Sequence, residues 1–146
     1  LNIYIGEMAG KVLPEAFTCF TLNLDNLSEL TKRFGYTVGD GVLKDFAGLV
    51  QLMGDTEGMR GYNGVGRFVV FFEECSSKKA AAMIRILDNQ VEEYNSLNPE
   101  YPIRYTAAWA TTEETDTYEI RELLRLSQKK WKQMEKEKKD KTEEET

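Results

Sequence analysis

A β-strand pattern followed closely by helix patterns limits the folds open to this chain. Residues 16–24 (AFTCFTLNL) alternate apolar with small polar side chains, which is typical of a strand. Gly39-Asp40 then opens a stretch in which apolar side chains recur at helical spacing, namely Val42, Leu43, Phe46, Leu49, Val50 and Met53. Between them, Asp25 or Asn26 can cap a short helix.

Strand and helix patterns of the same kind continue to the end of the chain and give a complete element order. The expected elements are a strand over 16–24, helices over 26–34 and 39–53, strands over 59–62 and 68–72, a helix over 76–94, a strand over 103–110 and a helix over 115–138. This order, β-α-α-β-β-α-β-α, predicts an α+β fold with helices packed on a mainly antiparallel sheet. We expect one domain over residues 1–135 and a charged, disordered tail over 136–146.

Composition excludes several classes of function. The net charge of −6 argues against sequence-independent nucleic-acid binding, which requires a basic surface. The chain has no histidine, so it lacks the commonest general base and the commonest zinc ligand. Cys19 and Cys75 form no metal or redox motif and are expected as buried or incidental thiols of a reducing compartment. No apolar run reaches the roughly 20 residues of a membrane span.

Glycines gather around Asn63-Gly64, between the strands predicted over 59–62 and 68–72. They form neither a phosphate-binding loop nor a dinucleotide-binding motif. Asn-Gly is a strong signal for a tight hairpin turn. We therefore interpret Gly64 and Gly66 as hairpin residues, with φ > 0 at one or both.

Short motifs follow the first predicted strand. In order and without gaps they are Asn23-Leu24-Asp25, Leu27-Ser28, Thr31-Lys32, Gly35-Tyr36 and Gly39-Asp40. At the same offsets they resemble the Asp-hydrophobic-Asp, Phe-Lys, Asn-Asp, Gly-His and Gly-Asp of the GGDEF family, the diguanylate cyclases. Gly64-Val65-Gly66-Arg67-Phe68 then stands where that family has Gly-Gly-Asp/Glu-Glu-Phe. The resemblance covers about residues 16–136 and implies a GGDEF, nucleotidyl-cyclase-like fold.

The resemblance implies a metal site at which this chain departs from the family. Mg²⁺ ions on the GTP phosphates would be held at Asn23, Leu24 and Gly66, and a hard cation needs oxygen ligands, preferably anionic. Asn23 offers at best a neutral carbonyl, Gly66 has no side chain, and Arg67 is a cation where the family has an acid. We therefore expect no metal, no cofactor and no catalytic residue.

The nucleotide contacts implied by the resemblance are also incomplete. Thr31 replaces the Asn that reads guanine, while Asp40 keeps the Asp, although a helix N-cap is its simpler role. Glu135 stands where the family clamps phosphate with a Lys, so we expect an exposed basic helix face at Lys132, Lys136 and Lys139. The window 55–58 lacks the Arg-x-x-Asp of the family's product-inhibition site.

The sequence is compatible with three functions. The first is a catalytically inactive GGDEF-like domain of a bacterial signalling protein, a regulatory or dimerisation module whose partner is itself or another GGDEF domain. The second is metal-independent binding of GTP or a cyclic dinucleotide, with Lys32 and Arg67 neutralising phosphate. The third and least favoured is an active diguanylate cyclase in which Asp25, Glu29 and Asp40 recruit a metal.

The beginning of the sequence at Leu1 suggests a fragment of a longer protein, so we expect a sensor domain upstream. We expect a cytoplasmic location, either free or as the cytoplasmic part of a membrane-bound sensor.

Overall fold

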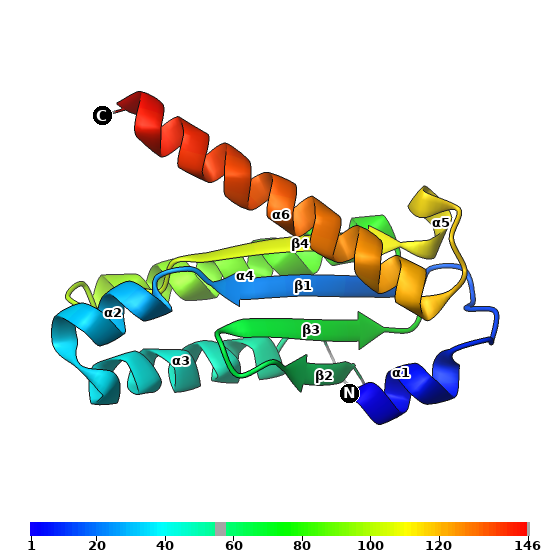
Figure 1. Cartoon of the computed structure of the whole chain (residues 1–146), viewed down its shortest axis with the longest axis horizontal. Coiled ribbons are helices and arrows are strands. Elements are labelled where there is room, and N and C mark those ends of the chain that lie inside the picture. Colours follow the sequence, from blue (N-terminus) through cyan, green and yellow to red (C-terminus); the bar gives the residue numbers. More distant parts are fainter. Residues whose placement is uncertain (55–57, 146) are drawn as a thin grey trace.

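The computed structural model describes residues 1–54 and 58–145, with side chains up to Thr142. A four-stranded antiparallel sheet in the order β2-β3-β1-β4 lies at its centre (Figure 1). The strands are β1 (Thr18–Leu24), β2 (Met59–Tyr62), β3 (Arg67–Phe72) and β4 (Tyr105–Thr111). The helices are α1 (Asn2–Met8), α2 (Leu27–Phe34), α3 (Tyr36–Gln51), α4 (Ser77–Leu97), α5 (Thr112–Thr115) and α6 (Ile120–Glu145).

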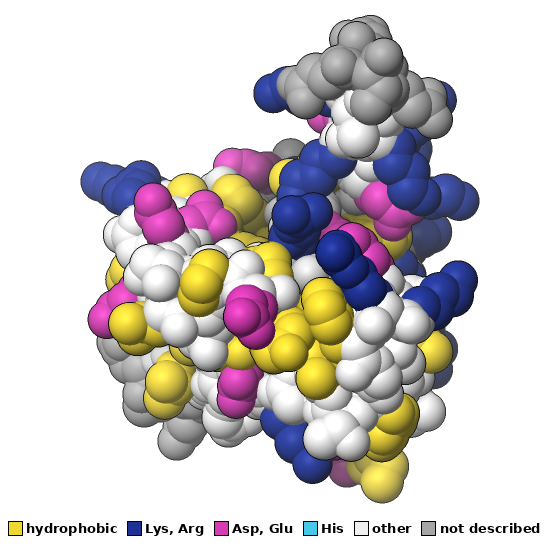
Figure 2. All heavy atoms as spheres, turned by 90° about the vertical axis from the view of Figure 1, so that its left-hand side faces the viewer, with side chains coloured by type: hydrophobic (Ala, Val, Ile, Leu, Met, Phe, Trp, Pro, Cys, Tyr) yellow, Lys and Arg dark blue, Asp and Glu magenta, His cyan; other side chains and the backbone are white. Residues whose placement is uncertain are grey.

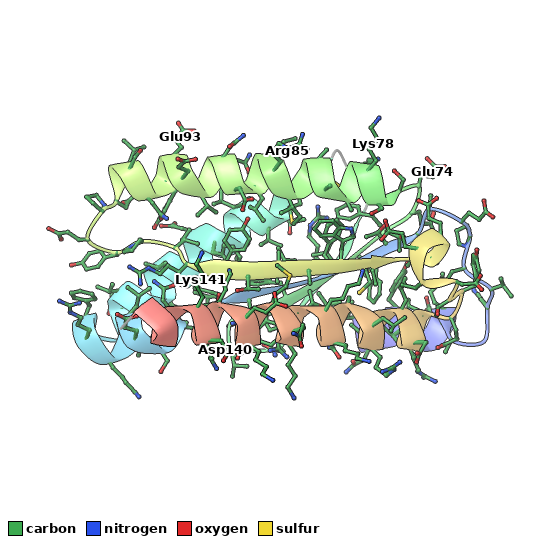
Figure 3. All side chains as sticks on the ribbon, turned by 90° about the horizontal axis from the view of Figure 1, so that it is seen from above. Glu74, Lys78, Arg85, Glu93, Asp140 and Lys141 are labelled. Atoms are coloured by element: carbon green, nitrogen blue, oxygen red, sulfur yellow. The ribbon has the colours of Figure 1, made fainter. Side chains whose placement is uncertain are left out.

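Helices cover both faces of the sheet, because side chains alternate between the faces along each strand. Figure 3 shows α4 and α6 on opposite sides of β4. Phe20 and Leu22 of β1 belong to the larger core on the α3 and α4 side, where the Phe46 ring lies 5.6 Å from Phe68. Cys19, which precedes Phe20 in the sequence, lies on the other face, with its Sγ 3.2 Å from the Ser127 Oγ of α6.

The α6 face of the sheet changes character along its length. At one end, Phe17, Phe71, Ile120 and Leu123 form a second, smaller apolar core. Toward the other end, the register pairs Asn23 of β1 with Arg67 of β3 and with Thr106 of β4. These polar residues therefore lie side by side at one end of the strands, on the sheet face that α6 covers.

The predicted class and the antiparallel sheet are confirmed, but several boundaries differ. The helix predicted from Gly39-Asp40 begins at Tyr36, because Gly35, with φ 96°, serves as both the C-cap of α2 and the N-cap of α3. Asp40 is therefore not an N-cap: it lies inside α3 and pairs with Lys44 at 3.0 Å. No helix is expected from the sequence pattern where α1 lies.

The last helix differs at both ends. Asp116 adopts φ 53° and separates the short α5 from α6, so the helix predicted from Thr115 begins at Ile120. At the other end α6 continues to Glu145, whereas composition predicted a disordered tail from residue 136. The domain boundary at residue 135 stays a prediction.

Two further expectations concern the cysteines and the membrane. Cys19 and Cys75 are both buried and free, as predicted. Within the described ranges, no helix combines the length and the apolar character that crossing a membrane requires.

Candidate functional site

A pocket of about 450 Å³ lies where the end of β1 meets the distal half of α6. Its lining residues are Asn23, Asp25, Thr106, Glu135, Lys138, Lys139 and Thr142. We call it the strand-end pocket. Figure 2 views this end of the molecule, and lysine and arginine side chains gather there beneath the projecting end of α6.

Hydrogen bonds within the pocket engage both oxygens of Asp25. The Asn23 side-chain amide donates to one of them at 2.9 Å, and the Thr106 hydroxyl donates to the other at 2.6 Å. Thr106 in turn accepts a hydrogen bond from Lys138 Nζ at 2.8 Å, which also donates to the Tyr105 carbonyl at 2.9 Å. Asp25 therefore does not cap a helix. It joins β1 to β4, and Lys138 ties α6 to the same network.

The other charged groups of the pocket come from α6. Lys139 pairs with Glu135 at 2.8 Å, and this hydrogen bond, followed by the charges of Glu135 and Asp25, raises the pKa of the Lys139 amine. Lys132 and Lys136 lie on the exposed side of the helix. The sequence does not single out Lys138, because its contacts with β4 depend on which side of α6 faces the sheet.

The β2–β3 hairpin next to the pocket has a backbone shaped by glycine. Gly64 and Gly66 both have positive φ, 90° and 91°, as predicted for at least one of them. The Asn63 side-chain oxygen accepts from the Val65 and Arg67 N–H groups at 3.0 and 3.2 Å, which closes the turn. Val65 lies exposed at the tip.

Gly66 is the hairpin residue nearest the end of β1. Its carbonyl accepts from Leu24 N at 2.8 Å, and a Cβ added to it would lie 3.3 Å from the Leu24 carbonyl oxygen. An acidic side chain at position 66 would therefore be both strained at φ 91° and crowded by Leu24. Phe68, two residues after Gly66, is buried and packs against Tyr62 with ring centroids 4.8 Å apart.

Arg67 does not line the strand-end pocket, although it is the register partner of Asn23. Its guanidinium carbon lies 3.9 Å from the ring centroid of Trp131 in α6, close enough for a cation–π interaction. Arg67 instead lines a second groove, between the hairpin and Gln128 of α6.

The predicted nucleotide-contact residues of α2 and α3 also lie outside the pocket. The Thr31 hydroxyl donates to the Leu27 carbonyl at 2.9 Å and lies where a Cβ on Gly39 would be, so it fills the contact between the two helices. Lys32 is exposed on α2. Asp40 is engaged by Lys44. Residues 55–57, from the window compared with the product-inhibition motif, lie outside the described residues.

The residues at the strand ends do not match the donor set that Mg²⁺ prefers. Asp25 is the carboxylate nearest the end of β1, and Asn23 turns its amide nitrogen toward it. Gly66 offers no side chain, and the Lys138 ammonium lies 2.8 Å from the Thr106 hydroxyl. Across the described residues, no group of three His, Cys, Asp or Glu side chains is placed to hold a metal ion. A hard divalent cation requires several anionic or neutral oxygens, which these side chains do not supply.

Comparisons with known proteins agree with this architecture. The family model described as diguanylate cyclase, GGDEF domain, matches residues 8–141. The active GGEEF domain of a diguanylate cyclase from Vibrio cholerae is 19% identical, with a TM-score of 0.73 over 83% of this chain and 77% of that chain. An EAL/GGDEF domain protein from M. capsulatus is 13% identical, with a TM-score of 0.72 over 93% of this chain and 87% of that chain.

A third solved structure describes a novel interaction mode between a microbial GGDEF domain and cyclic di-GMP. It is 25% identical, with a TM-score of 0.60 over 75% of this chain and 65% of that chain. Comparison with curated proteins found no match. Because the family model spans nearly the whole sequence and the observed fold agrees with it, the chain belongs to the GGDEF family.

Proposed function

We propose that this GGDEF domain has no diguanylate cyclase activity and serves a bacterial signalling protein as a regulatory or dimerisation module. The observation that carries the proposal is the donor set at the strand ends. Asp25 is held by Asn23 and Thr106, and Gly66 replaces the second acid. A cyclase that works on Mg²⁺-bound GTP requires anionic ligands to hold the metal while the phosphates react.

The local backbone supports the proposal independently of residue identity. At φ 91° and 3.3 Å from the Leu24 carbonyl, position 66 accepts glycine more readily than any acid. The hairpin would therefore have to change shape before an acidic side chain at this position could reach a metal.

Incubation of the purified chain with GTP and Mg²⁺, followed by chromatographic analysis of the nucleotides, tests the absence of activity. The active Vibrio cholerae GGEEF domain, assayed in parallel, is the positive control. We expect the control to form cyclic di-GMP and this chain to leave GTP unchanged. Formation of cyclic di-GMP that requires Asp25 would overturn the proposal.

The regulatory part of the proposal is supported by what similar proteins contain. The M. capsulatus relative is named as a protein with EAL and GGDEF domains, so a domain of this fold can form part of a larger protein. We propose a cytoplasmic domain that associates with itself or with another GGDEF domain, under an upstream sensor. Sedimentation velocity over a range of concentrations, alone and with the Vibrio cholerae domain, measures this association. A chain that stays monomeric in both series would contradict it.

A second candidate is metal-free binding of a guanine nucleotide in the strand-end pocket. It is favoured by Lys138 and Lys139, whose ammonium groups line the pocket with the Asn23 amide and the hydroxyls of Thr106 and Thr142, and it is opposed by the carboxylates of Asp25 and Glu135. Calorimetric titration with GTP in the presence of a chelator tests it, with Lys139→Gln as the informative variant. Binding that weakens in that variant and with added salt would support the candidate. The absence of heat at high GTP concentration would remove it.

A further inference from the structure

The side of the β2–β3 hairpin that faces α6 forms a groove of about 370 Å³ that the strand-end chemistry does not use. It lies between the hairpin, the start of α1 and the middle of α6. Its polar lining comes from Asn2, Tyr62, Asn63, Arg67 and Gln128. We call it the Arg67 groove. Its size is within the range of small-molecule sites.

The charge of the Arg67 groove is positive. Among the described residues that line it, Arg67 has a positively charged side chain, and no Asp or Glu is present to offset that charge. Lys132 follows Gln128 by one turn of α6, so both lie on the same side of that helix. The strand-end pocket, in contrast, contains Asp25 and Glu135.

Arg67 is held in a fixed position without using all of its hydrogen-bonding capacity. Its guanidinium packs 3.9 Å from the Trp131 ring centroid, and Trp131 is only 6% exposed. Within the described part of the chain, Arg67 Nε is buried without a hydrogen-bond partner, and no acidic side chain forms an ion pair with the guanidinium. A ligand in the groove cannot reach Nε, because the surrounding protein covers that atom, so the donors that Arg67 can offer to a ligand are its terminal NH₂ groups.

One hairpin side chain is also set as a donor. The Asn63 side-chain oxygen accepts from Val65 N and Arg67 N, which leaves the NH₂ group of that amide to donate. Tyr62 lies on the other face of the sheet, where its ring packs against Phe68 of the larger core, so its hydroxyl is not counted among the donors. The turn therefore prepares the Asn63 amide as a donor near the guanidinium.

We propose that the Arg67 groove binds an oxyanion of the phosphate class, with Arg67 as its charged contact and Asn63 and Gln128 as neutral donors. A phosphate has enough acceptor oxygens to satisfy several donors at once, and the planar guanidinium matches its geometry. The ligand is either free inorganic phosphate or the phosphate end of a larger molecule. The proposal does not depend on the function proposed above, because it concerns a different groove.

Fluorescence of Trp131 reports on the Arg67 groove directly. The chain has two tryptophans, so a Trp109→Phe background leaves Trp131 as the only one. Inorganic phosphate is titrated into this protein at constant ionic strength, with chloride as the balancing anion. Phenyl phosphate is titrated in parallel. We expect a saturable fluorescence change, and tighter binding of phenyl phosphate would identify a phosphate monoester as the preferred form.

Two variants with the same charge change separate a specific site from general attraction. Arg67→Gln removes the central contact, whereas Arg85→Gln removes an exposed cation on α4, on the other side of the sheet (Figure 3). We expect Arg67→Gln to weaken phosphate binding at least about tenfold, because charge-assisted hydrogen bonds are the strong ones. Arg85→Gln should leave the affinity unchanged.

Side-chain amide signals of Asn63 and Gln128 in nitrogen-edited NMR spectra give a second measurement on the unmutated chain. Both signals should shift with phosphate and saturate at the same concentration as the fluorescence. The proposal is overturned by the absence of saturable changes in the unmutated chain. It is equally overturned if Arg67→Gln and Arg85→Gln, both shown to be folded by circular dichroism, bind phosphate alike.

Discussion

The two halves of the sheet face under α6 differ in what they contribute to the molecule. In one half, Ile120 and Leu123 of α6 are fully buried against Phe17 and Phe71. In the other half, α6 meets the sheet through polar and charged contacts around Thr106 and Asp25. Apolar burial is the larger source of stability, whereas exposed polar pairs add little. The apolar half therefore holds α6 in place, and the polar half is free to vary in chemistry without loss of the fold.

Truncation of Leu123 should break the apolar half and give the largest effect. Leu123→Ala removes a fully buried side chain, and we expect the free energy of unfolding to fall by about 2–5 kcal/mol. Asn23→Ala, the matched change in the polar half, should lower it by less than about 1.5 kcal/mol. Urea denaturation followed by circular dichroism measures both. Equal losses would show that the two halves contribute alike.

Alanine at the two hairpin glycines sharpens the role of the backbone beside Asn23. Both glycines have φ near 90°, so Gly64→Ala and Gly66→Ala should each lower the free energy of unfolding by about 1–2 kcal/mol. Gly64 has open space around it, whereas a Cβ at Gly66 meets the Leu24 carbonyl. We therefore expect the loss for Gly66→Ala to be the greater. If chemical denaturation gives the reverse order, the close approach of the hairpin to β1 is wrong.

Stability at high pH probes the interior beneath α6. Burial raises the pKa of the Cys19 thiol from 9.0 to about 12. The folded state therefore keeps this proton where the unfolded state releases it, so the contribution to stability is complete below pH 9 and is lost as pH rises toward 12. We expect a fall of about 1 kcal/mol between pH 8 and pH 10, from 1.4 kcal/mol for each pKa unit. Denaturation of Cys19→Ala over the same range should show a smaller fall.

Removal of Lys138 should have the smallest effect on stability. Lys138 is exposed, although its amine donates to Tyr105 and Thr106. We expect Lys138→Met to lower the free energy of unfolding by less than about 1 kcal/mol, while hydrogen exchange becomes faster in α6 beyond Trp131. Lys136→Met, on the exposed side of the helix, should change neither quantity. A large loss for Lys138→Met would show that the polar half also anchors α6.

Sequence periodicity was sufficient to predict the strands, because each core strand has a strong apolar pattern. It missed α1, which has no side-chain cap and contains no fully buried residue. It also misplaced the start of α3, because Gly35 joins two helices through a single residue with φ 96°. The split between α5 and α6 depends on a positive φ at Asp116, and the surrounding sequence gives no signal for it.

The candidate site was predictable only in part, for a related reason. The positions of Asn23, Asp25 and Gly66 follow from local motifs on β1 and the hairpin. The contact of Arg67 with Trp131 joins residues far apart in the sequence and requires the docking of α6 to be known. For the same reason, the sequence alone could not identify Lys138 as a residue of the strand-end pocket.

Manganese binding tests the central claim most directly, because free Mn²⁺ gives an electron paramagnetic resonance signal that disappears when the ion is bound. The chain and its Asp25→Asn variant are titrated with Mn²⁺ in the presence of a GTP analogue that cannot be hydrolysed. The donor set at the strand ends predicts that both proteins leave the same amount of Mn²⁺ free. Stoichiometric loss of the free signal in the unmutated chain, abolished in Asp25→Asn, would contradict the claim.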